Sequence, residues 1–196
     1  AAVPDPTNPW TGKDHPPPDL APELYRAMVD GALNPWLKDQ LASLPGMIAY
    51  DYSGGGLPAL YFRRIDQICR QAGARLTVVY VPFHGVTHPR YAPAMIALGM
   101  DRTIAERLST DPSFLRQRLV VSEICSGLGV PLADTTEPLI RAERESGPQF
   151  WNHDSHPRPS GYATITRTIH EVMRKSIGEP RRSNRTDRGS DRPKRG

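Results

Sequence analysis

Two histidines and an aspartate lie within four positions of one short stretch, at His153, Asp154 and His156. An imidazole can take a proton from a hydroxyl near neutral pH if a carboxylate selects its tautomer and stabilises the imidazolium that forms. Asp154 lies two positions before His156 and could supply that carboxylate. Trp151 on one side and two prolines on the other would stiffen the stretch, so it could hold side chains without a helix.

Two other interpretations of the same residues remain open. His153, Asp154 and His156 could together bind a metal ion, although no further cluster of ligands is evident in the sequence. They could also form an exposed polar turn without chemistry. The elements around the stretch are needed to separate these interpretations from catalysis.

The surrounding sequence predicts alternating helices and strands. Residues 76–82 form a nearly continuous apolar, β-branched run, which is typical of a strand covered on both faces in a parallel sheet. Helices are predicted over 22–44, 60–73, 94–109, 112–127, 136–145 and 161–176, with short strands at 47–52 and 130–134 and a loop over 149–159. This order indicates a layered α/β domain.

The last part of this pattern resembles a known family. An Asp-x-His-Pro loop, a Gly-Tyr pair a few residues later and a closing amphipathic helix resemble the final conserved block of SGNH/GDSL hydrolases, here residues 154–165. Residues 72–82 resemble the long strand before that block, and residues 129–134 resemble the short strand that precedes the catalytic loop. The resemblance covers residues 60–175. It implies a three-layer α/β/α fold with a flavodoxin-like parallel sheet, incomplete at its N-terminus.

The resemblance implies that His156 is the general base and that Asp154 orients it. The complete enzyme would act on a small acyl ester or an acylated carbohydrate through an acyl-enzyme, without a cofactor and without a metal. The one-residue spacer between the two is similar to that of the polysaccharide O-acetyltransferase branch, so acetyl transfer is an alternative to hydrolysis. A non-catalytic surface or glycan-binding module is a further alternative.

The nucleophile block Gly-Asp-Ser and the oxyanion block Gly-x-Asn-Asp have no counterpart in the sequence. We therefore expect both blocks upstream of Ala1 or on another chain. Ser53, in a Ser-Gly-Gly-Gly turn between a predicted strand and a predicted helix, is the one internal substitute. Substrate contact is conceivable for His153 and for His84 and His88, which follow the strand over 76–82.

Composition sets the domain limits. Residues 1–20 are rich in proline and are predicted to be an extended connector, 21–178 the α/β domain, and 179–196 a disordered basic tail. Within the tail, residues 180–196 hold seven basic and two acidic residues, which leaves residues 1–179 at −1 of the total +4, so no nucleic-acid partner is predicted. No membrane span is predicted, and an extracytoplasmic location is favoured if a signal or anchor lies upstream. Cys69 and Cys125 are expected to be buried thiols, with a disulfide as the alternative in an exported protein. The oligomeric state is not predicted.

Overall fold

The protein is described by a computed structural model, which covers residues 56–151 and 154–178 together with 22, 25 and 26. Of Asp154 it gives the backbone and not the side chain. The predicted connector 1–20, the strand 47–52 and the tail 179–196 lie outside the described residues, as do Ser53 and His153.

From Gly56 to Gly178, the described residues form seven α-helices, two 3-10 turns and four short strands. In chain order they are α3 (Gly56–Gln71), β1 (Val78–Tyr80), α4 (His84–Thr87), η1 (Pro89–Tyr91), α5 (Ala92–Ala97), α6 (Arg102–Arg107), η2 (Pro112–Leu115), α7 (Arg116–Leu128), β2 (Leu132–Asp134), α8 (Thr136–Glu145), β3 (Phe150–Trp151), β4 (Asp154–Pro157) and α9 (Pro159–Gly178).

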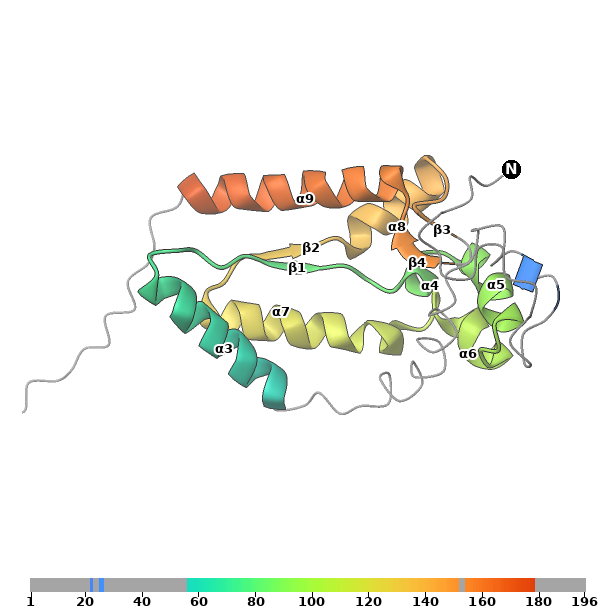
Figure 1. The fold of residues 1–196 in the computed structure, drawn as a ribbon, viewed down its shortest axis with the longest axis horizontal. Helices are drawn as coiled ribbons and strands as arrows, with labels where there is room; N and C mark the ends of the chain where they lie inside the picture. The colour runs from blue at the N-terminus through green and yellow to red at the C-terminus, as the bar shows by residue number, and fades with distance from the viewer. Residues whose placement is uncertain (1–21, 23–24, 27–55, 152–153, 179–196) are drawn as a thin grey trace, which may run out of the picture.

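The strands β1 and β2 pair in parallel, with Val79 opposite Ala133. A parallel pair needs a crossover connection, which α7 provides before the chain returns as β2. Helices lie on both sides of this pair, α3 and α7 on one side and α8 and α9 on the other (Figure 1). The mixed α/β class predicted from the sequence is therefore confirmed, with helices making up most of the described residues.

Two local predictions were wrong. Strand β1 spans three residues rather than seven, and Val79 within it and Val81 just after it are 39% and 43% exposed, so the helices described on the two sides cover the predicted strand only in part. The described residues place a neighbour on one edge of β1 only, which explains the exposure. The predicted loop over 149–159 contains the antiparallel pair β3–β4, a short hairpin that begins at a buried Phe150.

Glycines explain where the helices break. The predicted helix over 94–109 is two helices, α5 and α6, because Gly99 adopts a φ of +99° between them, a conformation that few other residues tolerate. Helix α7 ends at Gly129, whose φ of +63° forms a left-handed cap. Helix α8 has the predicted bounds 136–145, and α9 extends the predicted helix by two residues at each end.

The core lies where α4, η1 and α5 meet α8, β3 and α9. Its largest fully buried apolar side chains are Tyr91, Phe150, Met95 and Leu139. Of the two cysteines, Cys125 is buried, Cys69 is half-buried, and both are free thiols.

Candidate catalytic hairpin

The residues predicted to move protons lie on the β3–β4 hairpin. Phe150 is opposite Pro157, and Trp151 is opposite Asp154. Positions 154 and 156 are two apart on β4, and the register of the pair shifts between Phe150 and Trp151, so β4 is not a regular strand there. His156 is exposed to solvent. The structure therefore places positions 154 and 156 on one short strand. It does not describe the Asp154 side chain, so a contact between that carboxylate and His156 stays a prediction.

The hairpin starts beside the carboxyl end of the parallel pair. Four residues after β1 ends, the ring of His84 lies 6.1 Å from the ring of Phe150, measured between centroids. In Figure 1, β4 and α4 lie at the end toward which β1 and β2 run. This end of an α/β sheet is where ligands usually bind.

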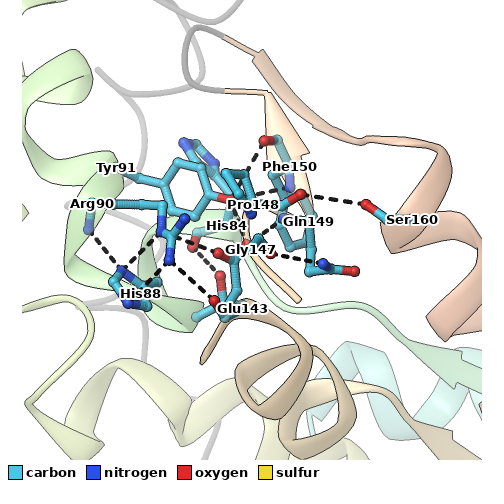
Figure 2. Close-up of polar contacts among 11 residues, drawn as sticks. His84, His88, Arg90, Tyr91, Glu143, Gly147, Pro148, Gln149, Phe150 and Ser160 are labelled. Atoms are coloured by element: carbon cyan, nitrogen blue, oxygen red, sulfur yellow. Dashed lines mark hydrogen bonds and ion pairs between the residues drawn. The ribbon is translucent and has the colours of Figure 1, made fainter. Parts of the chain in front are cut away.

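A buried carboxylate fixes the first residues of the hairpin. The Glu143 side chain, fully buried on α8, accepts a hydrogen bond from the Tyr91 hydroxyl and a second from the Gln149 backbone N–H at 2.7 Å. The Tyr91 hydroxyl also accepts from the Phe150 N–H at 3.1 Å (Figure 2). The backbone N–H groups of Gln149 and Phe150 thus donate to two side chains from other elements. Because unpaired buried polar groups are costly, this arrangement strongly favours one position for β3.

Electrostatics within this cluster favour a neutral Tyr91. Burial, and then the hydrogen bond to Glu143, raise the pKa of Tyr91 well above its usual range. The phenol therefore stays protonated and keeps donating to the carboxylate. Glu143 has a counter-charge in Arg90, whose Nε lies 3.3 Å from Oε2 and whose Nη2 donates to the Glu143 carbonyl at 3.0 Å.

His88 holds Arg90 in this position. Its Nδ1 accepts hydrogen bonds from the Arg90 backbone N–H at 3.1 Å and from the Arg90 Nε at 3.2 Å. Burial, followed by the charge of Arg90, lowers the pKa of His88. The imidazole is thus kept neutral, as an acceptor must be. His88 was a candidate for substrate contact, and the structure gives it this internal role.

His84, the other candidate for substrate contact on this side, is fully buried. Its ring contacts the rings of Phe83 at 4.4 Å and Tyr91 at 5.0 Å between centroids, both edge-on. The His84 ring thus lies within the aromatic core and not at the surface. Substrate contact by His84 stays a prediction.

A second set of contacts fixes the other end of the hairpin. The Gln149 carbonyl accepts from the Arg158 N–H at 2.7 Å, and the first turn of α9 passes so close that a Cβ on Gly161 would lie 2.3 Å from the same oxygen. This close approach explains why position 161, the first residue of the Gly-Tyr pair, is a glycine. Beyond the base, the Arg158 guanidinium lies 4.5 Å from the centre of the Trp151 ring, which is 44% exposed.

Sequence reasoning missed Tyr91 and Glu143. A signal for Glu143 exists in α8: positions 136, 139 and 143 share one helical face, so a glutamate falls on the same face as the buried Leu139. No comparable signal marks Tyr91, because its partner lies 52 positions away.

Among the described residues, no three His, Cys, Asp or Glu side chains are close enough together to hold a metal ion. The alternative metal site predicted from the sequence uses His153 and the Asp154 side chain, which both lie outside the described residues. The helices that the structure describes also include none that is long and apolar enough to cross a membrane. Searches against protein-family models, curated proteins and solved structures return no match. The resemblance to SGNH/GDSL hydrolases therefore rests on the residues of this chain alone.

Proposed function

We propose that this chain carries the base-bearing part of a serine ester hydrolase or acyltransferase of the SGNH type, in a three-layer domain with a flavodoxin-like sheet. His156 takes the proton of a serine hydroxyl as that oxygen attacks the ester carbonyl. Asp154 holds the imidazole in the required tautomer. The alcohol leaves with the same proton, and water or a carbohydrate hydroxyl then releases the acyl group.

One observation carries this proposal: the hairpin that bears positions 154 and 156 begins beside the carboxyl end of a parallel strand pair and leaves His156 accessible. A general base has to reach the substrate hydroxyl, and its position has to be held to within tenths of an ångström. The contacts from Glu143 and Tyr91 to the backbone of residues 149 and 150 supply that rigidity at the base of the hairpin.

The nucleophile remains a separate question. A serine upstream of Ala1 or on another chain is the first option, and Ser53 is the option within this sequence. A fluorophosphonate probe distinguishes them, because it forms a covalent bond only with an activated serine. If Ser53 is the nucleophile, the isolated chain is labelled and Ser53→Ala abolishes the label; if the serine lies upstream, labelling requires the longer polypeptide.

The base is tested by hydrolysis of a small acyl ester, p-nitrophenyl acetate, with the form of the protein that the probe labels. We expect His156→Asn to lower the rate at least ~100-fold, since general-base catalysis contributes about that much. Asp154→Asn should have a comparable effect at unchanged stability. His170→Asn is the matched control, because His170 is also an exposed histidine, on α9. Equal rates for His156→Asn and His170→Asn would remove the proposal.

A second candidate is a glycan-binding module without catalysis. The observation in its favour is the exposed Trp151 ring, which Arg158 braces from one side and which a sugar ring could stack against on the other. This candidate predicts that Trp151→Ala abolishes retention on an immobilised polysaccharide, while no form of the protein reacts with the serine probe.

A further inference from the structure

Helix α3 has its apolar side turned away from the protein. Asp66 is the one buried residue of this helix, and it pairs with Arg70 at 2.7 Å. The Arg70 guanidinium also donates to the Leu128 carbonyl of α7 at 3.3 Å, so the side of α3 that carries Asp66 lies against the protein. Five large apolar side chains of α3, which we call the outer stripe, are 47% to 60% exposed: Leu57, Leu60, Tyr61, Ile65 and Ile68.

Helical geometry places the outer stripe opposite the buried side. Residues two positions apart on a helix point in nearly opposite directions, so Ile68 points away from the side that buries Asp66. The other members of the outer stripe recur three or four residues apart and share the face of Ile68. A helix on the surface of a globular protein normally has the reverse arrangement, with its apolar face toward the core. An exposed apolar surface of this extent indicates a partner that covers it.

The charges of α3 indicate the kind of partner. Arg64 lies within the outer stripe, four residues after Leu60 and four before Ile68, and Arg63 lies next to it. Both arginines are exposed, and the described residues give neither an ion pair; the Arg64 Nη1 donates to the Gln67 side chain at 2.9 Å. Asp66, the only acidic residue of α3, already pairs with Arg70. The exposed surface of this helix is therefore apolar and basic.

A partner that covers the outer stripe also has to accommodate Arg64. Burial of this guanidinium against an apolar protein surface would be strongly unfavourable without a carboxylate. A second copy of this chain would bring another Arg64 and no acidic residue from α3. The surface of an anionic membrane differs, because the apolar stem of an arginine can follow the acyl chains while its guanidinium reaches the phosphates.

We propose that α3 docks this protein on an anionic membrane surface, with the outer stripe among the acyl chains and Arg63 and Arg64 at the lipid phosphates. An apolar face flanked by basic residues is the pattern of helices that lie in a membrane interface. Docking through α3 leaves the candidate site free, because the β3–β4 hairpin lies beyond the carboxyl ends of β1 and β2, away from α3 (Figure 1). The proposal does not depend on the ester chemistry.

The test is sedimentation of the full chain with lipid vesicles, either of phosphatidylcholine or of an equal mixture of phosphatidylcholine and phosphatidylserine. We expect binding to the mixed vesicles, and Leu60→Ser should lower the partition coefficient at least ~10-fold by removing apolar contact. Leu119→Ser is the matched control, because Leu119 is 57% exposed on α7 and lies outside the outer stripe.

A second pair of variants tests the charge. Arg64→Gln should lower partitioning into the mixed vesicles about fivefold and leave that into phosphatidylcholine unchanged. Arg141→Gln, at an exposed position of α8, is its control. The basic residues within 180–196 also attract the chain to anionic lipid. The comparison of variants that all keep these residues therefore tests α3 itself.

Three results would overturn the proposal. The first is no binding to the mixed vesicles, or equal binding by Leu60→Ser and Leu119→Ser. The second is a lower free energy of unfolding for Leu60→Ser than for Leu119→Ser in urea denaturation without lipid, which would mean that another part of the chain covers the outer stripe. The third is a dimer in sedimentation equilibrium that Leu60→Ser abolishes, which would identify a second copy as the partner.

Discussion

Two regions of this molecule, one around Tyr91 and one around α3 and β1, differ in how completely their side chains are buried and hydrogen-bonded. Around Tyr91, the phenol, the Phe150 ring and the Glu143 carboxylate are all buried. The Tyr91 hydroxyl donates to the Glu143 carboxylate and accepts from the Phe150 backbone N–H, so hydrogen bonds join distant elements. Around α3 and β1, apolar side chains remain half exposed and one strand edge has no described partner. The segment from α4 to α9 therefore closes its own core, whereas α3 and β1 leave apolar surface for a partner to cover.

The largest expected effect tests whether the closed side depends on its buried carboxylate. Glu143→Ala leaves the Tyr91 hydroxyl and the Gln149 N–H without their acceptor and Arg90 without its counter-charge. We expect a loss of ~3 kcal/mol in the free energy of unfolding, measured by urea denaturation.

Glu145→Ala is the matched control, because Glu145 is exposed on the same helix, and it should change stability by less than ~0.5 kcal/mol. Similar losses in the two variants would mean that the cluster around Tyr91 contributes nothing special. The contrast between the two sides would then disappear.

The next effect tests the steric limit at the hairpin base. Gly161→Ala places a methyl group 2.3 Å from the Gln149 carbonyl oxygen, so α9 or β3 has to shift. We expect a loss of ~2 kcal/mol in the same denaturation experiment, within the range for overpacked sites.

Gly127→Ala provides the opposite result on α7. No heavy atom lies within 4 Å of a Cβ at that position, so alanine should stabilise the protein by ~0.5–1 kcal/mol through its higher helix propensity. If Gly161→Ala were equally stabilising, the close approach of α9 to β3 would be wrong.

Much of the fold could be predicted because its signals are local. Helix α8 has the predicted bounds, and β2 lies within the predicted strand over 130–134. The break between α5 and α6 was missed, although Gly99 marks it, since a glycine inside a helical pattern can be tolerated or can end the helix. The β3–β4 hairpin was missed because its strands are two and four residues long and the second ends in a proline, which gives no strand periodicity.

The candidate site divides in the same way. The Asp154 and His156 pair is visible in the sequence because its members are two positions apart. The contacts that hold their hairpin join Tyr91 to Glu143 across 52 positions, and no local pattern encodes such a pairing. The exposure of Val79 was also unpredictable, because an apolar run does not say how many neighbours its strand has.

The smallest effect concerns pH and the support that His88 gives to Arg90. Because burial and the charge of Arg90 lower the pKa of His88 in the folded protein, the unfolded chain binds the proton more readily. The stability that His88 contributes is therefore fully present above the ordinary pKa of ~6.5 and is lost as the pH falls through the lowered value.

The variant His88→Asn tests this argument, because Asn keeps an acceptor for the Arg90 N–H and does not titrate. We expect His88→Asn to lose less stability than the unmodified protein between pH 7 and pH 5, by under ~1 kcal/mol. His170→Asn, on the exposed face of α9, should leave the pH dependence unchanged. Parallel curves of the free energy of unfolding against pH for His88→Asn and the unmodified protein would show that protonation of His88 does not lower stability.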